Sequence, residues 1–183
     1  MNMLPTFVHR TPPAHSDGVT LIEILVAILI LSFGLLGSAG LQMAGLRAAV
    51  AANQRTTATL LAYDAADRMR ANKAGATAGF YHNYTPQQNN NCIQSAGCDA
   101  QQMAQHDMWE WGQAIAAQLP GGMGIVCRDQ TPDDGASNVS LVAAMCDSAG
   151  GFHKYVIKIW WLEDRSETNP AGTLKRFVTQ VYP

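Results

Sequence analysis

Charged side chains are scarce in this chain. Only 14% of its 183 residues are Asp, Glu, Lys or Arg, and the formal net charge is −2. The sequence therefore has no basic run suited to a nucleic-acid-binding arm and no acidic block of the kind found in disordered tails. The cations Arg68, Arg70 and Lys73 are interpreted as a solvated helix end, so we expect no direct nucleic-acid binding.

Catalytic motifs are also missing. Ser, His and Asp occur, but none in a nucleophile elbow, and no pair of carboxylates lies in a recognisable catalytic pattern. Gly121, Gly122 and Gly124 are not followed by the Lys-Ser pair or the helix of a phosphate loop, so they are interpreted as a turn. These absences leave no catalytic constellation, so we expect no enzymatic activity and no cofactor.

Zinc-binding spacings are absent as well. No C-x2-C and no H-x3-H pattern occurs, and His82, His106 and His153 are scattered along the chain. We therefore expect no metal site. One question stays open at the aspartate-rich loop Asp129–Asp134, which offers the oxygen ligands that calcium prefers but lacks the spacing of an EF-hand.

A long apolar run is present near the N-terminus. It starts as GVTLIEILVAILIL at Gly18 and continues to Leu46, with no charged residue between Ile24 and Leu41. A bilayer core requires roughly 20 apolar residues in helical form, so the run is long enough to span a membrane. It nevertheless contains Glu23, and an unpaired charge inside a bilayer costs about 3 kcal/mol. We therefore expect Glu23 to be functional and to have a partner.

The residues before this run have the character of a leader peptide. They contain Arg10 and several prolines and end at a small residue, Gly18. An ordinary secretory signal is cut after its apolar core, whereas the only suitable junction here lies before the core. A cut between Gly18 and Val19 would leave the span on the mature protein. It would also place a new amino group one helical turn from Glu23.

The hexapeptide Gly18-Val-Thr-Leu-Ile-Glu23 resembles the leader junction of type IV pilins and the related pseudopilins. The resemblance implies that prepilin peptidase in the inner membrane cuts between Gly18 and Val19 and that the new N-terminus at Val19 is methylated. It also implies that Glu23 is the assembly carboxylate, which pairs with the N-terminal ammonium of a neighbouring subunit. The family usually has Phe at the first mature position, where this chain has Val.

The domain organisation follows from these boundaries. We expect a cytoplasmic leader at residues 1–18, a transmembrane and filament-core half of a long helix at 19–46, and a periplasmic globular domain at 47–183. The long helix is predicted to run from about Val19 to about Asn72, with Asp64 and Arg68 paired at i,i+4. One broad apolar face of its second half is expected to comprise Leu46, Val50, Thr57, Leu60, Leu61 and Ala65.

The rest of the chain predicts a loop, a second short helix and a sheet. Composition indicates a loop over residues 73–97 and a helix over about 100–119, with core positions Met108, Trp111, Ile115 and Leu119. Strands are expected within 124–129, 140–146, 152–164 and 174–183. In the third of these, Tyr155, Ile157, Ile159 and Trp161 share one face. The fold class is therefore α+β, with the long helix packed on a C-terminal antiparallel sheet, which is the pilin architecture.

All four cysteines lie after the expected span. Arg10 before the span places the leader in the cytoplasm by the positive-inside rule and the domain in an oxidising compartment. Four cysteines allow three pairings. We favour Cys92–Cys98 and Cys127–Cys146, because nearest neighbours would each close a loop.

Three stretches resemble PilV-type minor pilins: LLGSAGLQMAGL, TLLAYDAADRMRANKA and the W-x3-I-x3-LPGG turn. This resemblance implies a low-abundance subunit that joins other minor pilins and the major pilin in priming pilus assembly, in the inner membrane and then in the filament. A tip position with a large adhesin-like partner, cell adhesion and twitching motility are further implications. What the loop from Gly75 to Gly97 contacts stays open.

Two alternatives remain at this point. A type II secretion pseudopilin shares the leader and Glu23. A membrane-anchored periplasmic domain that never polymerises has no use for Glu23, so the substitution Glu23→Leu distinguishes it from a filament subunit.

Overall fold

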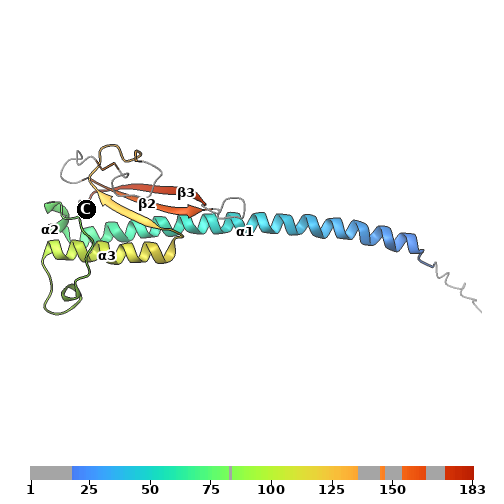
Figure 1. Cartoon of the computed structure of the whole chain (residues 1–183), viewed down its shortest axis with the longest axis horizontal. Coiled ribbons are helices and arrows are strands. Elements are labelled where there is room, and N and C mark those ends of the chain that lie inside the picture. The colour runs from blue at the N-terminus through green and yellow to red at the C-terminus, as the bar shows by residue number, and fades with distance from the viewer. Residues whose placement is uncertain (1–17, 83, 136–144, 147–153, 164–171) are drawn as a thin grey trace, which may run out of the picture. The chain divides into compact units, whose positions relative to one another are not determined.

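The computed structural model describes residues 18–82, 84–135, 145–146, 154–163 and 172–183. In chain order the elements are α1 (Leu21–Ala71), α2 (Lys73–Ala78), the 3-10 helix η1 (Asn90–Ile93), α3 (Ala100–Gln118), β1 (Met123–Cys127), β2 (Tyr155–Glu163) and β3 (Thr173–Val181) (Figure 1). The expected α+β class is confirmed. The chain divides into two compact units, Met1–Gly45 and Leu46–Pro183, which are described separately.

The first unit contains the apolar beginning of α1. Every residue from Leu21 to Val50 is exposed, including all the leucines, isoleucines and valines of the run. Within the described part of the chain, α1 is the helix that is long and apolar enough to cross a membrane, judged by length and composition. The helix continues to Ala71, close to the end predicted from the sequence.

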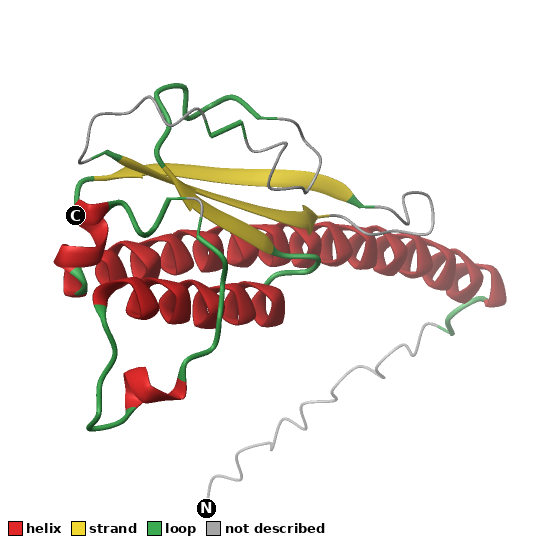
Figure 2. Cartoon of the chain, turned by 60° about the vertical axis from the view of Figure 1, so that its left-hand side comes forward, coloured by secondary structure: helices red, strands yellow, loops and turns green. Residues whose placement is uncertain are grey.

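The second unit is built on an antiparallel sheet with the strand order β1-β2-β3. Figure 2 shows the sheet lying over a layer formed by α3 and the neighbouring end of α1. The predicted core face of β2 is confirmed, because Tyr155, Ile157, Ile159 and Trp161 belong to one buried cluster with residues of α1 and α3. The opposite face of β2 is buried as well, with Trp160 packed against Ile125 and Cys127.

Helix α3 matches its prediction closely. Asp99 caps its N-terminus by accepting a hydrogen bond from the Gln102 N–H at 2.8 Å, and the Gln102 side chain accepts from the Asp99 N–H. Such a capping box satisfies two backbone donors that the first turn leaves free. The positions predicted as core, Met108, Trp111, Ile115 and Leu119, are all buried.

The predicted apolar face of the second half of α1 is partly wrong. Leu46, Val50 and Leu60 are 63%, 57% and 63% exposed. The face that is buried instead consists mainly of small residues: Ala58, Leu61, Ala62, Ala65, Ala66 and Met69. Alanines allow two helix backbones to approach closely, so α3 and the sheet pack on the alanine side of α1 and leave the larger leucines outside.

The segment predicted as a continuous loop, residues 73–97, contains two short helices. Asn72 caps α2 by accepting a hydrogen bond from the Gly75 N–H at 3.2 Å, and Gly79 ends the helix in the left-handed conformation with φ of 90°. A side chain at Gly79 would be strained at this φ. Loop-like composition hid this helix because its six residues are too few to show a period.

The expected strand at 140–146 lies outside the described residues, except for Met145 and Cys146. Side chains that precede β1 in the chain accept hydrogen bonds from backbone N–H groups in and just after this strand. The Tyr84 hydroxyl oxygen accepts a hydrogen bond from the Val126 N–H at 3.3 Å, and His82 Nδ1 accepts one from the Arg128 N–H at 3.1 Å. Burial raises the pKa of Tyr84 to about 12, so this hydroxyl stays neutral at physiological pH.

Candidate functional site

The residues expected to be processed and methylated lie at the beginning of α1. Gly18 and Val19 precede the helix, and Glu23 lies in its first turn, with its N–H bonded to the Thr20 carbonyl at 3.1 Å. A carboxylate in this position interacts favourably with the positive end of the helix dipole. Both Val19 and Glu23 are exposed, and no ion pair to Glu23 exists among the described residues.

The glycines of the apolar run are also open to the outside. A Cβ atom added at Gly34, Gly37, Gly40 or Gly45 would meet nothing within 4 Å. These glycines therefore make no close contact with another part of the described chain. Their small size would allow a neighbouring helix to approach closely.

Arg68 joins α1 to α3 through carboxylates. Its guanidinium lies 3.0 Å from Asp64 on the same helix, 2.8 Å from Glu110 and 3.6 Å from Asp107. The predicted Asp64 pair is confirmed, whereas the interpretation of Arg68 as part of a solvated helix end is wrong. Burial alone would lower the pKa of Arg68, but the hydrogen bonds to Glu110 and Asp64 raise it above its ordinary value.

A second polar contact lies beneath Arg68. Tyr81 is fully buried, and its hydroxyl donates a hydrogen bond to Asp107 Oδ2 at 2.5 Å. Burial raises the pKa of Tyr81, and the Asp107 contact raises it further. The pKa of Asp107 is also raised, because burial outweighs the opposing effects of Tyr81 and Arg68. Trp111 provides a further polar contact between α3 and α1, because its Nε1–H donates a hydrogen bond to the Leu61 carbonyl at 2.7 Å.

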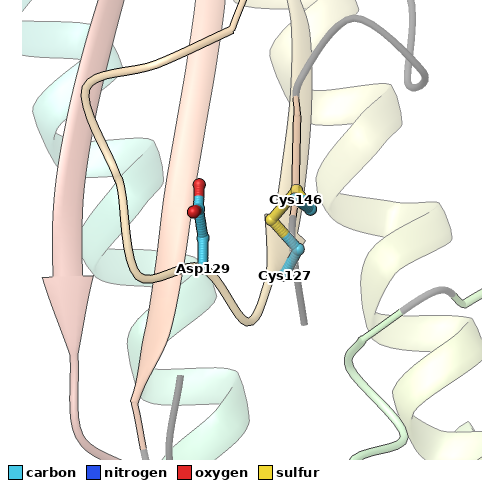
Figure 3. Close-up of side chains that lie close together, drawn as sticks. All are labelled: Cys127, Asp129 and Cys146. Atoms are coloured by element: carbon cyan, nitrogen blue, oxygen red, sulfur yellow. A yellow bond between two sulfur atoms is a disulfide. The ribbon is translucent and has the colours of Figure 1, made fainter. Parts of the chain in front are cut away.

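The structure contains two disulfides, Cys92–Cys98 and Cys127–Cys146, which are the pairs favoured above. Figure 3 shows the second disulfide beside Asp129 on the loop that leaves β1. Ligand atoms of Cys127, Cys146 and Asp129 lie within 4.8 Å of one another, an arrangement that could suggest a metal site. The two sulfurs are bonded to each other, however, so they offer no thiolate to a metal.

The aspartate-rich loop is held by the protein's own cations. The Lys158 ammonium lies 2.6 Å from Asp129 Oδ2 and 3.1 Å from Asp134 Oδ1. Arg176 donates to the carbonyl oxygens of Asp134 and Asp133, each at 2.7 Å. Several oxygens that a calcium ion would need are therefore engaged by Lys158 and Arg176.

The sequence analysis did not identify Lys158 or Arg176 as partners of this loop. Strand alternation placed Lys158 on the face opposite the core, where a lysine is usually solvated, yet its side chain is fully buried. The one available signal was a lysine in the middle of a largely apolar strand.

A cavity of about 600 Å³ lies between α3 and β1. Its lining is largely apolar and aromatic and includes Tyr84, Met108, Trp109, Ile125 and Met145. The described lining includes no carboxylate, imidazole or free thiol.

Comparison with known families yields two matches along the first part of the chain. Residues 14–39 match the model described as the prokaryotic N-terminal methylation motif, and residues 40–109 match the family described as type IV pilin Tt1218. No curated protein and no solved structure matches the chain. Together with the fold, the two matches support a pilin-like subunit of the type IV pilin superfamily. The methylation motif implies processing by prepilin peptidase and assembly with other pilins, and pilins of this family are structural subunits.

Proposed function

We propose that this chain is a minor pilin, a low-abundance structural subunit that helps to prime the assembly of a type IV pilus. The observation that carries the proposal is the exposed apolar surface of α1. A membrane would cover this surface up to about residue 46, but Leu60 and Tyr63 lie well beyond it and are still 63% and 59% exposed. An anchor alone does not require apolar side chains there, whereas packing against other subunits does.

Glu23 supplies the assembly chemistry in this proposal. Prepilin peptidase cuts after Gly18, and the new amino group at Val19 is methylated. A carboxylate in a low-dielectric surrounding is tolerated when it is paired and hydrogen-bonded. Glu23 of one subunit is therefore paired only when the N-terminal ammonium of a neighbouring subunit reaches the correct axial position.

The proposed location is the bacterial inner membrane, followed by the pilus. The N-terminal segment with Arg10 stays in the cytoplasm, α1 crosses the membrane once, and the disulfide-containing domain lies in the periplasm. The PilV-type stretches support a subunit that acts with other minor pilins and the major pilin. A large adhesin-like partner at the tip, adhesion and twitching motility belong to this same proposal.

Mass spectrometry of filaments sheared from cells tests filament entry. We expect small amounts of the chain relative to the main subunit, beginning at methylated Val19. Glu23→Leu should be inserted into the membrane but be absent from the filaments. Ser32→Ala is the matched control on the same exposed helix, because the Ser32 hydroxyl is satisfied by the Ile28 carbonyl at 2.7 Å. Normal filament entry of Glu23→Leu contradicts the proposal.

A second pair of variants separates a subunit from a membrane-anchored domain. Leu60→Asn should lower filament entry without changing membrane insertion, whereas Thr56→Asn, an exposed polar position one turn earlier, should have little effect. A chain that is processed in the membrane but never found in sheared pili favours a type II secretion pseudopilin or a subunit that only primes assembly. A chain that still begins at Met1 excludes both readings.

A further inference from the structure

Lys158 and Asp129 form an ion pair of an unusual kind. Lys158 lies in the middle of β2, opposite Ile125 of β1 and Val178 of β3. Its side chain and that of Asp129 are both 0% exposed, and Nζ lies 2.6 Å from Oδ2. Removing two opposite charges from water carries a desolvation penalty that can exceed the gain from their mutual attraction. A neutral covalent product would avoid that cost.

We propose that Lys158 and Asp129 are a site of spontaneous amide formation, which joins β2 covalently to the loop after β1. This inference does not depend on the proposed function. The Asp129 carboxyl is already oriented, because its Oδ1 accepts the Thr131 N–H at 2.9 Å while Oδ2 faces the lysine. Fixing two reacting groups in contact removes most of the entropic barrier that the same reaction has in water.

A route for the protons is also present. Asp134 Oδ1 lies 3.1 Å from Lys158 Nζ and can accept a proton from it. The Thr131 hydroxyl contacts Asp134 Oδ2 and lies 3.4 Å from Asp129 Oδ1, so it stands between the two carboxyls. The Asp134 side chain is 35% exposed, which leaves an exit for the water released.

The reaction balances without a further reactant. Nζ forms a bond with the carboxyl carbon of Asp129, and the bond from that carbon to Oδ1 breaks. The ammonium loses two protons, which pass through Asp134 and Thr131 to the departing oxygen and leave with it as one water. The positive and negative charges cancel in the product, and no oxidation or reduction occurs.

The test is the mass of the full chain after purification in detergent, reduction and alkylation of the cysteines. We expect a mass lower by one water than the sequence requires. After trypsin digestion, the peptide containing Asp129 should be joined to the one containing Lys158, with no cleavage after Lys158. A mass without this loss, or a loss located elsewhere, overturns the proposal and leaves an ordinary ion pair.

Variants separate the amide from other dehydrations. Lys158→Arg should abolish the loss of water, and Thr131→Val should lower the cross-linked fraction severalfold. Lys175→Arg is the matched control, because the Lys175 side chain is 39% exposed and its ammonium lies 3.6 Å from Glu163. It should keep the full loss. If Lys158→Arg also keeps it, the water comes from another reaction, such as succinimide formation at Asp134 before Gly135, and the proposal fails. The wild-type mass and digest decide the matter even if a variant does not fold.

Discussion

Replacing Gly124 by alanine should destabilise the domain by overfilling its core. A Cβ at Gly124 would lie 2.5 Å from Ile115 Cδ1 and 2.5 Å from Trp111 Cη2. The isoleucine methyl can rotate away, but the indole is held in place because its Nε1–H donates to the Leu61 carbonyl at 2.7 Å. Overfilled cores typically cost about 1–3 kcal/mol. The contact with the fixed indole therefore makes Gly124→Ala destabilising.

Gly112 is the matched control. It lies in the middle of α3, and a Cβ there would meet nothing within 4 Å. Gly112→Ala should therefore stabilise the protein by about 0.5–1 kcal/mol, because alanine loses less conformational entropy than glycine in a helix. The same chemical change thus has opposite predicted signs at the two glycines.

Thermal unfolding of the full chain in detergent, followed by circular dichroism, measures both changes. At this domain size, 1 kcal/mol corresponds to about 3–5 °C in Tm. Ile115→Val removes the methyl nearest Gly124, so it should cost less in the Gly124→Ala background than in the wild type. If Gly124→Ala is as stable as the wild type while Gly112→Ala is more stable, the packing argument is refuted.

Three further predictions concern pH, disulfides and calcium. The pKa of Asp107 is raised in the folded protein, so the free energy of unfolding should fall as pH rises from about 3.8 through the raised value. Unfolding measurements across that pH range should show that Asp107→Asn removes this fall. Reducing Cys127–Cys146 should lower the free energy of unfolding by roughly 3 kcal/mol and reducing Cys92–Cys98 by roughly 2 kcal/mol, because the larger ring restricts the unfolded chain more. Peptide mapping without reduction checks the pairing. Calcium or a chelator should not change Tm, since protein cations occupy the aspartate loop; a rise in Tm with calcium would contradict the assignment.

Local sequence signals were sufficient where a single element determines its own structure. The LPGG turn at Pro120 marked the end of α3, because helix breakers act within a few residues. Trp111 and Ile115 follow the helical period and face the core. Tyr155 and its alternate neighbours in β2 were equally predictable, because one face of a strand must be apolar to pack on helices.

Tertiary partners were not accessible in the same way. Periodicity showed that Leu46, Val50 and Leu60 are apolar, but it could not distinguish packing within the chain from packing against a neighbour. Arg68 was interpreted as solvated because its partner Glu110 lies on another helix. The burial of Lys158 was missed because strand alternation shows which face of the sheet a residue occupies. It does not show whether other parts of the chain cover that face.

The distribution of contacts along α1 suggests how a pilin-like subunit would transmit force. The buried residues of this helix begin at Ala58 and end at Met69, and both polar ties to α3, through Leu61 and Arg68, fall within that interval. Everything from Leu21 to Val50 is exposed and free to contact other molecules. If the first half of α1 is held in a filament, a pull on the domain loads this short alanine-rich interface, together with the Arg55–Glu163 ion pair at 3.6 Å and the covalent chain that continues into α2. Helix α3 is in turn joined to the sheet by packing, so a pull should break the contacts at Leu61, Arg68 and Arg55 before it separates the strands.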